Sequence, residues 1–382
     1  MPPPPLRVAH LITDLDVGGA EKMLSRLVRA MDPAVVSHLV ISMTDAGPLG
    51  TALARDGYDV RCLGLRRGRV SAAAPLALRR ILREWRADLL ETWLYHADLL
   101  GTLATVGGTS PTLVWNLRAS VMDMRQYGWL SGATRSLCAR LSRRPALIIA
   151  NSEAGVSAHA ALGYRPRAWR VLPNGIDTDE YAPDGRRRAV VRSALGIPEA
   201  AVVVGVGARY DPMKGHDVLA DALADWLPAA PDVHVLVAGA GVGWDAPAYA
   251  ALARRAPACV PRVHLLGPRD DMPAVWNACD VGCAPSHGEG FPNAVAEAMA
   301  TGLPVVVTDV GDSAALVAEP TLVVPPAQPG ALASTLAGIT ALPADARQAL
   351  GARARARVVA HYSIASAAAR YAETYRDAVE QR

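Results

Sequence analysis

Two glutamates around a glycine–proline turn form the densest group of chemically capable residues in this 382-residue chain. The run Glu-Gly-Phe-Pro-Asn-Ala-Val-Ala-Glu extends from Glu289 to Glu297 and follows a short apolar stretch, Val281–Ala284. Proline is common in the first turn of a helix, so the spacing predicts a helix from Asn293, whose free amides and positive dipole end suit a phosphate. The glycine and proline place Glu289 in the preceding loop. The two carboxylates would then reach different parts of one ligand.

A second group combines two cations with glycines. The stretch Gly205-Val-Gly-Ala-Arg209-Tyr-Asp-Pro-Met-Lys214-Gly-His216 opens from an apolar run into a loop. Arg209 offers a planar fork of donors and Lys214 a mobile point charge, which together suit a diphosphate. The spacing fits neither G-x-G-x-x-G nor G-x-x-x-x-G-K-[ST]. Two solvated loop cations are the alternative interpretation.

Two further groups follow apolar runs in the first half of the chain. Gly18 and Gly19 come after the run Leu6–Ile12, where they allow close approach of a ligand to the backbone, although a plain tight turn explains them nearly as well. His96 falls at the carboxyl end of the run Leu89–Trp93, and His10 has a similar claim at the end of the first run. A lone histidine is more often structural than functional.

The remaining polar signals are weaker. Arg118 is a further candidate, although an ordinary surface arginine explains it better. The Asp-x-Asp pairs at Asp14 and Asp177 could hold a divalent metal, but no other ligand cluster accompanies them, so turn acids are expected. The five cysteines contain no C-x-x-C pair and are predicted to be buried thiols in a reducing compartment.

Arginines are concentrated in the first half of the chain. A helix with Arg83 and Arg86 beside apolar Leu76, Leu78, Ile81, Leu82 and Trp85 is predicted to be able to lie on anionic lipid, with a solvated arginine face as the alternative. A second basic group is formed by Arg135, Arg140, Arg143 and Arg144. The N-terminus has no basic region followed by a long apolar run, and no stretch of about 18 apolar residues occurs, so a cytoplasmic protein is expected.

Short apolar runs alternate with longer amphipathic stretches along the whole chain. Continuous apolar strands separated by helices indicate parallel sheets buried on both faces, so the predicted fold class is α/β. In such sheets ligands bind beyond the carboxyl ends of the strands, where the groups around Glu289, Arg209, Gly18 and His96 are predicted to lie. The predicted strands are Leu6–Ile12, Ser37–Met43, Leu89–Trp93, Leu113–Asn116, Leu147–Ala150, Ala201–Gly205, Val233–Ala238, Val263–Leu266, Val281–Ala284 and Val305–Thr308.

The length of the chain predicts two domains. The turn-rich, acidic stretch Leu172–Asp184 lies near the middle of the chain and is the predicted boundary. Residues 1–175 contain 22 basic and 13 acidic residues, a net charge of +9, whereas residues 176–382 carry a net charge of −6. The first half would therefore favour anionic surfaces.

Taken together, these segments resemble the retaining glycosyltransferases of family four. The resemblance covers the chain from residue 8 to about 375 and implies the GT-B fold, in which two Rossmann-like, doubly wound domains face each other across a cleft. Residues 1–175, with a C-terminal helix at about 363–382 that crosses back, would bind the acceptor, and residues 176–362 the nucleotide sugar. The matching segments are Gly18-Gly-Ala-Glu21, Pro173-Asn-Gly-Ile-Asp177, Gly207-Ala-Arg209 with Lys214-Gly215, Glu289–Glu297 and Gly302-Leu-Pro-Val-Val-Val-Thr-Asp309.

The resemblance also implies a role for each matching residue. Arg209 and Lys214 would hold the donor's diphosphate and stabilise charge on the departing nucleotide, and Glu297 would accept the ribose hydroxyls. Glu289 would hold the donor sugar with the backbone of Gly290, Phe291, Pro292, Asn293 and Ala294.

Three positions complete the implied site. Gly18 and Gly19 would approach the phosphates from the other domain. Arg269, in the loop Gly267–Asp270, would flank the base. His96 stands where the family has a cleft histidine, so His96, Glu289, Arg209 and Lys214 are the expected catalytic set. No cofactor or bound metal is implied.

The implied reaction is retaining transfer of a sugar from a UDP- or GDP-type nucleotide sugar to a hydroxyl, in bacterial cell-surface polysaccharide or lipid-linked glycan synthesis. A glycan or lipid-linked acceptor and peripheral contact with an anionic membrane at the inner face of the cell membrane are expected for the basic half. Alternatives are a nucleotide-sugar epimerase on the same fold and a non-catalytic nucleotide- or carbohydrate-binding module. A dinucleotide oxidoreductase has weaker support, because Trp244 occupies the last glycine position of Gly239-Ala-Gly-Val-Gly243. Nucleic-acid binding is not expected in a chain with a single phenylalanine, Phe291.

Overall fold

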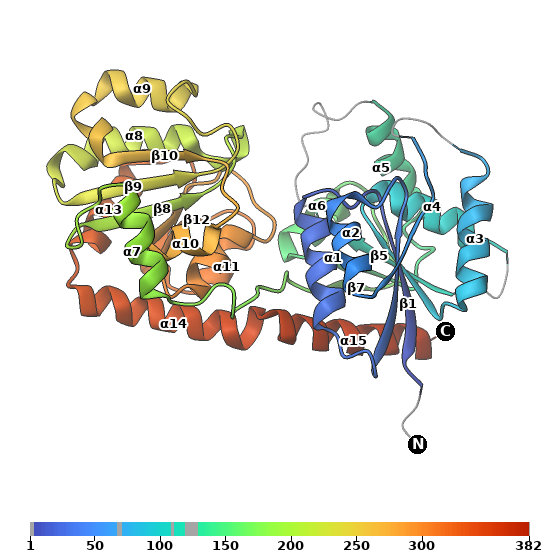
Figure 1. The fold of residues 1–382 in the computed structure, drawn as a ribbon. Helices are drawn as coiled ribbons and strands as arrows, with labels where there is room; N and C mark the ends of the chain where they lie inside the picture. The colour runs from blue at the N-terminus through green and yellow to red at the C-terminus, as the bar shows by residue number, and fades with distance from the viewer. Residues whose placement is uncertain (1–3, 67–70, 108–110, 119–128, 382) are drawn as a thin grey trace. The chain divides into compact units, whose positions relative to one another are not determined.

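The computed structural model describes residues 4–66, 71–107, 111–118 and 129–381 (Figure 1). The contacts within the chain divide it into two compact units, Met1–Gly175 with Ile364–Arg382, and Ile176–Ser363. The change from the first unit to the second falls inside the stretch Leu172–Asp184. Arg67 and Arg69, two further arginines of the basic first half of the chain, lie outside the described residues.

The described part of the first unit contains a seven-stranded sheet in the order β3-β2-β1-β4-β5-β6-β7. Neighbouring strands are parallel throughout, as the apolar runs predicted. The strands are β1 (Leu6–Ile12), β2 (Val36–Ser42), β3 (Asp59–Cys62), β4 (Leu89–Trp93), β5 (Thr112–Leu117), β6 (Leu147–Ala150) and β7 (Trp169–Val171). The helices are α1 (Gly19–Ala30), α2 (Gly47–Arg55), α3 (Ala74–Trp85), α4 (Tyr95–Thr105), α5 (Trp129–Leu141), α6 (Glu153–Ala161) and α15 (Ile364–Glu380).

Helices cover both faces of this sheet. Side chains of α1, α2 and α15 share a buried cluster with Val8 and Ile12 of β1. Side chains of α3, α4 and α5 share another cluster with Ala9 and Leu11 of the same strand. Because successive residues of a strand point to opposite faces, β1 supplies both cores. This is the doubly wound arrangement that the resemblance implied.

The apolar face of α3 is part of this core, which corrects the predicted lipid-facing helix. Leu78, Leu82 and Trp85 are buried, so they are not available to a bilayer. Leu76 is 66% exposed, and Arg83 and Arg86 are exposed on the outer side. The same spacing of apolar residues is expected for a core-facing helix and for a lipid-facing helix. The packing of α3 in the core beside the sheet shows that it is core-facing.

The described part of the second unit contains a six-stranded sheet in the order β10-β9-β8-β11-β12-β13. Its neighbouring strands are also parallel, and helices on both sides bury a single large core. The strands are β8 (Val202–Gly207), β9 (Val233–Ala238), β10 (Val263–Gly267), β11 (Val281–Ala284), β12 (Val305–Thr308) and β13 (Val323–Val324). The helices are α7 (Gly185–Ala194), α8 (His216–Trp226), α9 (Pro247–Arg255), α10 (Met272–Asn277), α11 (Asn293–Ala300), α12 (Ser313–Val317), α13 (Pro329–Ala341) and α14 (Ala344–Tyr362).

The C-terminal helix α15 packs on the sheet of the first unit, although it follows the whole second unit in the sequence (Figure 1). Its inner face is held by two tyrosines one turn apart, Tyr371 and Tyr375, both fully buried. Tyr375 donates to the Glu91 carboxylate over 2.7 Å, and Tyr371 accepts from Asn116 over 3.1 Å. The helix is therefore attached by polar bonds as well as by apolar packing.

All five cysteines are free thiols. Cys138, Cys259, Cys279 and Cys283 are buried, as predicted. Cys62 is exposed, so the expectation of a buried thiol is wrong there. It is the last residue of β3, an edge strand of the sheet, where only one side of the strand has a neighbour.

Candidate functional site

A cavity of about 300 Å³ lies at the carboxyl ends of β8 and β11, the two central strands of the second unit. Two connections line it, because the loops that follow neighbouring parallel strands meet at one edge of the sheet. Arg209 and Lys214 come from the β8–α8 connection. The β11–α11 connection and the start of α11 supply Ser286, Glu289, Phe291, Pro292, Asn293, Ala294 and Glu297.

The β8–α8 connection is held against the β11–α11 connection by a glycine. Gly215 has a φ of +64°, and a Cβ at this position would lie 1.9 Å from the carbonyl oxygen of Pro285. Only glycine fits there, since other residues carry that Cβ and rarely adopt a positive φ. The glycine next to Lys214 therefore sets how close the two connections approach each other.

Asp211 organises the connection that carries both cations. Its Oδ2 accepts from Arg209 Nε over 3.0 Å and from Nη2 over 2.7 Å, and its Oδ1 accepts from the Met213 amide over 2.9 Å. Burial acts to raise the pKa of Asp211, but the hydrogen bonds from Met213 and Arg209 outweigh it, so the pKa lies below its usual value. Asp211 is therefore ionised, and it orients Arg209 while capping the short turn Pro212–Lys214.

Lys214 forms an ion pair inside the cavity. Its Nζ lies 2.7 Å from Glu289 Oε1, and the Ser286 hydroxyl donates to the same oxygen over 2.7 Å. The side chain of Lys214 is 27% exposed and that of Glu289 11% exposed. The backbone of Ser286 is fixed in turn, because the Thr308 hydroxyl donates to its carbonyl over 2.6 Å. The position of the Glu289 carboxylate is therefore fixed through Ser286, whereas Lys214 has a longer and more mobile side chain.

The N-terminal end of α11 opens onto the cavity. Pro292 occupies the cap position, and no side chain caps the helix. The Pro292 carbonyl accepts from the amides of Val295 and Ala296, which begins the hydrogen-bond pattern of the helix. Pro292 and the first helical residues line the cavity, so the positive end of the helix dipole faces it. Glu297 lies one turn further along and also faces the cavity. This arrangement can bind an anion between the helix end and the two cations.

Phe291 and Gly290 belong to the structural base of this loop. Phe291 is 6% exposed and packs against Tyr362, with the ring centroids 5.6 Å apart. The Gly290 carbonyl accepts from the Asp312 amide over 3.1 Å. Gly311 approaches so closely that a Cβ there would lie 2.3 Å from the Glu289 carbonyl oxygen. Gly290 and Phe291 were predicted as site residues from the sequence. Their role in supporting Glu289 depends on the close approach of Gly311, which the sequence does not show.

Two predicted residues of the second unit, Gly290 and Arg269, are not among those that line the cavity. Arg269 is the more distant in the fold. It follows β10, an edge strand that lies two places away from β8 in the sheet. Its guanidinium donates to both carboxylate oxygens of Asp271, over 2.7 Å and 2.6 Å. In the glycine-rich stretch after β9, Gly239 is required for packing, because a Cβ at this position would lie 2.0 Å from the Ala208 carbonyl oxygen.

Gly18, Gly19 and His96 belong to the first unit, at the carboxyl ends of β1 and β4. Gly18 is the cap residue of α1, and a Cβ there would lie 2.1 Å from Glu21 Oε2, whereas Gly19 has open space around it. Burial raises the pKa of Glu21, which is folded over the start of the helix. The open space at Gly19 fits the predicted close approach of a ligand, and the tight packing at Gly18 fits a structural turn.

His96 stands on the first turn of α4 with an exposed side chain. Partial desolvation nevertheless lowers the pKa of its ring. The turn before it is strained: Leu94 has a φ of +73° and a ψ of 157°, a region that is almost restricted to glycine. The buried carboxyl of Asp98 lies below this turn and accepts from the Thr92 hydroxyl over 2.5 Å. Strained backbone of this kind persists where the surrounding structure holds a side chain in a required direction.

His10, the other candidate histidine, is fully buried under α15. Its Nδ1 lies 2.9 Å from Glu91 Oε2, and its Nε2 lies 2.9 Å from Nδ1 of His38. Glu91 also accepts from Trp93 Nε1 over 3.0 Å and from the amide of Asn116 over 2.8 Å. Burial lowers the pKa of His38 to about 3, and the nearby His10 contributes in the same direction. His10 therefore belongs to a structural network, and of the two histidines only His96 is accessible.

Arg118 extends this network rather than standing free. Its Nη1 donates to the Tyr371 hydroxyl over 2.9 Å, its Nη2 to the Asn174 side chain, and its guanidinium lies 5.1 Å from the Trp93 ring centroid. Sequence reasoning missed Glu91, His38 and Asn116 as partners. The available signal was that each is a polar residue inside an apolar strand.

No group of three or more His, Cys, Asp or Glu side chains that could hold a metal ion occurs in the described part of the chain. Within the same residues, no helix combines the length and the apolar character needed to cross a bilayer.

Comparisons with known proteins assign a family to both halves of the chain. The family model described as "Glycosyltransferase Family 4" matches residues 17–180, and the one described as "Glycosyl transferases group 1" matches residues 200–341. The two models between them include both connections of the cavity and the segment with Gly18, Gly19 and His96.

Curated relatives are similar over part of their length. A lipopolysaccharide core biosynthesis mannosyltransferase, LpsB, of Rhizobium meliloti (strain 1021) is 35% identical over 149 residues, which are 38% of this chain and 42% of that protein. A D-inositol 3-phosphate glycosyltransferase of Mycolicibacterium gilvum (strain PYR-GCK) is 37% identical over 145 residues, 37% of this chain and 31% of that protein. Each match thus spans less than half of the relative.

Among solved structures, HepE (Alr3699) of Anabaena in complex with UDP has the same fold, with a TM-score of 0.81. Its sequence is 23% identical, and the match covers 97% of this chain and 100% of that one. The same Anabaena protein was also solved with UDP-glucose. The α/β fold with two doubly wound sheets is thereby confirmed. The chain belongs to the glycosyltransferases of group 1 and family 4.

Proposed function

We propose that the chain transfers a sugar from a nucleotide-diphosphate sugar to a hydroxyl acceptor with retention of the anomeric configuration. One observation carries the proposal. The cavity of the second unit brings Arg209, Lys214, the first turn of α11 and the two glutamates to the carboxyl ends of neighbouring strands. A diphosphate with a sugar on one side and a ribose on the other is the ligand that these groups match.

The two cations stabilise the leaving group in this proposal. When the bond to the sugar breaks, negative charge develops on the nucleotide diphosphate, and preorganised donors aimed at such charge lower the barrier. Arg209 is held in place by Asp211, so it is preorganised. Lys214 exchanges its bond to Glu289 for a phosphate oxygen, which frees that carboxylate to accept hydroxyl groups of the sugar.

In this proposal the two glutamates bind opposite ends of the donor. Glu289 lies in the loop before α11 and takes the sugar, and Glu297 lies one turn into the helix and takes the ribose diol. The segment from Phe291 to Ala294 lines the space between them, and Arg269 is assigned to the base through its position after β10. The Anabaena protein with the same fold, solved with UDP and with UDP-glucose, supports a donor of the nucleotide-sugar class.

Retention follows from attack on the same face that the leaving group departs from. Glu289 keeps its hydrogen bond from Ser286 when Lys214 turns to the phosphate, which suits hydrogen bonding to a sugar better than attack on it. His96 is assigned to the reacting end of the sugar, and Gly19 to the phosphates, because of the family pattern and because both are accessible in the first unit. Charge stabilisation is assigned to Arg209 and Lys214, so turnover is expected to persist in EDTA.

The acceptor is proposed to be a glycan or a lipid-linked glycan of bacterial surface polysaccharide synthesis. The first half of the chain carries the net charge of +9 that an anionic membrane or acceptor would attract. Since the apolar face of α3 is buried, membrane contact at the inner face of the cell membrane would be electrostatic, through exposed arginines such as Arg83 and Arg86. The lipopolysaccharide role of the Rhizobium relative supports this class of acceptor.

A thermal-shift screen tests the donor assignment. UDP-, GDP-, ADP- and TDP-sugars are added to the full chain, and one class is expected to raise the melting temperature because it binds only the folded state. The double variant Arg209→Ala/Lys214→Ala is expected to lose that shift. Arg255→Ala is the matched control, since Arg255 pairs with surface Asp221 and Asp225 on the same unit. Equal shifts in the wild type and the double variant would overturn the proposal.

A further inference from the structure

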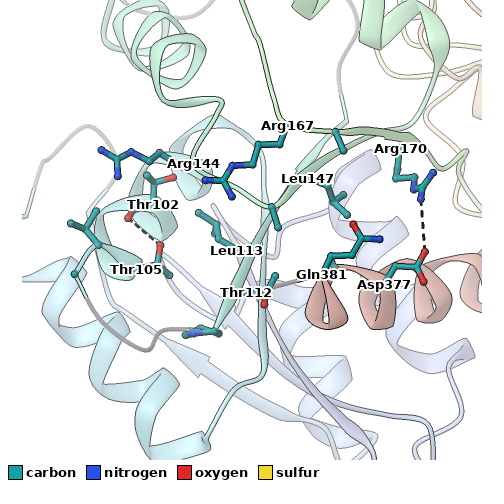
Figure 2. Close-up of a pocket in the computed structure, with 16 residues that line it drawn as sticks. Thr102, Thr105, Thr112, Leu113, Arg144, Leu147, Arg167, Arg170, Asp377 and Gln381 are labelled. Atoms are coloured by element: carbon teal, nitrogen blue, oxygen red, sulfur yellow. Dashed lines mark hydrogen bonds and ion pairs between the residues drawn. The ribbon is translucent and has the colours of Figure 1, made fainter.

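A cavity of about 500 Å³ in the first unit takes no part in the proposed function (Figure 2). It lies at the amino ends of β5, β6 and β7, where Thr112, Leu147 and Ala168 line it. Gly19 and His96, the assigned residues of this unit, lie at the opposite, carboxyl edge of the same sheet. Its size is within the roughly 300–1,000 Å³ of ligand-binding pockets. The cavity is therefore separate from the residues of this unit that are assigned to the reaction.

Two arginines at this edge of the sheet are used by the protein itself, and only Arg170 of the two lines the cavity. Arg79 donates to the carbonyls of Ala104 and Val106 over 2.9 Å and 2.6 Å, where it satisfies the end of α4. Arg170 lies 3.8 Å from Asp377 of α15, and Figure 2 shows this pair at one end of the cavity. Both cations offset negative groups that the fold leaves at this edge, where helices present their carboxyl ends.

Arg144 and Arg167 have no such partner. Both side chains are exposed and line the cavity, and neither forms an ion pair with another described residue. They come from different segments, the α5–β6 and α6–β7 connections. Figure 2 shows their side chains extended beside each other, over Thr102, Thr105 and Leu113. The carboxylate that lines the cavity, Asp377, lies beside Arg170, so a bound anion would supply the partner that Arg144 and Arg167 lack.

The rest of the wall suits a ligand with a compact body. Thr112 is 5% exposed, and its buried hydroxyl has no hydrogen-bond partner among the described residues. Such a group normally finds a partner, so its position in the wall of a cavity indicates a polar ligand. Gln381 offers an amide on the same side, and Leu113 and Leu147 supply apolar surface.

We infer that this cavity binds a phosphate-bearing ligand, with Arg144 and Arg167 on the phosphate oxygens and Thr112 and Gln381 beside the rest of the molecule. The inference does not depend on the proposed function, because none of these residues is assigned a role in it. A free phosphate ester and a phospholipid headgroup share this chemistry. Arginine favours such groups, since its fork of donors matches two phosphate oxygens at once.

Calorimetric titration of the full chain with inorganic pyrophosphate tests the inference. The variant Arg209→Ala/Lys214→Ala serves as the starting protein, so that pyrophosphate cannot bind at the cations of the second unit. Adding Arg144→Ser/Arg167→Ser is expected to weaken the remaining binding at least tenfold. Arg140→Ser/Arg143→Ser is the matched control, because it removes the same charge from exposed residues that do not line the cavity.

Vesicle sedimentation separates the two sources of phosphate. Vesicles of phosphatidylglycerol in phosphatidylcholine are compared with phosphatidylcholine alone, with the same two pairs of variants. Sedimentation that depends on Arg144 and Arg167, with no pyrophosphate binding, assigns the cavity to a lipid headgroup; pyrophosphate binding that depends on them assigns it to a soluble ester. The inference is overturned if neither probe binds, or if the control pair weakens binding as much as Arg144→Ser/Arg167→Ser.

Discussion

Two carboxylates, Glu91 in the first unit and Glu289 in the second, both accept more than one hydrogen bond but have very different partners and surroundings. Glu91 is fully buried and accepts from His10, Trp93, Asn116 and Tyr375, which come from three strands and α15. Glu289 is 11% exposed, accepts from Lys214 and Ser286, and borders a cavity. A carboxylate saturated by fixed donors stabilises the fold. One that is paired with a mobile lysine beside open space can change partners, which is what binding a ligand requires.

Removing the buried carboxylate should have the largest effect. Glu91→Ala leaves four buried donors without an acceptor, and loss of one member of a buried charged network costs about 3–5 kcal/mol. We expect the free energy of unfolding of the first unit to fall by that amount, measured by urea denaturation. Nucleotide-sugar binding by the second unit should be retained. A loss below about 1 kcal/mol would show that the network does not hold α15.

The cavity of the second unit should show the reverse pattern, with a large loss of activity and a small loss of stability. Lys214→Ala removes a donor to the developing charge, so kcat is expected to fall about 10²–10³-fold, about 3–4 kcal/mol. The free energy of unfolding should change by less than about 1 kcal/mol, since Lys214 is partly exposed. Steady-state kinetics and urea denaturation on the same preparation check both statements. Arg255→Ala, the surface control, should leave both quantities unchanged.

Part of the pH dependence of stability should come from His38 in the first unit. His38 has a pKa of about 3 in the folded chain and an ordinary value of 6.5. Below pH 6.5 the unfolded chain therefore binds a proton that the folded chain does not, and the free energy of unfolding falls by up to about 1.4 kcal/mol per pH unit towards pH 3.

Replacing His38 tests this sign. His38→Asn keeps an acceptor near Nε2 of His10 but cannot titrate, so urea denaturation between pH 7 and pH 5 should show a shallower slope. An unchanged slope would assign the acid sensitivity to other groups.

The smallest effect is expected from Asp211, which acts on the site by orienting Arg209 and by capping the turn before Lys214. Asp211→Asn keeps an acceptor for the Met213 amide, so the turn before Lys214 is retained, but the charge that holds Arg209 is lost. We expect kcat/KM for the donor to fall about tenfold, about 1.4 kcal/mol, mainly through KM. Asp211→Glu should recover part of the loss. A fall in the melting temperature with unchanged KM would make Asp211 a purely structural residue.

The cavity shows where sequence reasoning succeeds. Arg209 and Glu289 are distant in the chain, yet each follows a buried strand, and parallel strands carry such loops to one edge of a sheet. The supporting residues Ser286 and Asp211 were not predicted to act on them, because their partners come from contacts within and between loops. Arg269 also follows a strand, but β10 is an edge strand, and strand order is decided by tertiary packing.

The sequence by itself determined the α/β class, the boundary near residue 175, the helix from Asn293 and the residues around the cavity. These depend on local patterns: apolar runs, turn residues and loops that follow strands. The strands Asp59–Cys62, Trp169–Val171 and Val323–Val324 were missed because they are short, and the first two are partly exposed. Only the tertiary structure decided that α3 faces the core, that His10 is enclosed while His96 is accessible, and that Glu91 and Glu289 play different parts. Those outcomes depend on which side chains from distant segments meet, and composition and spacing do not contain that information.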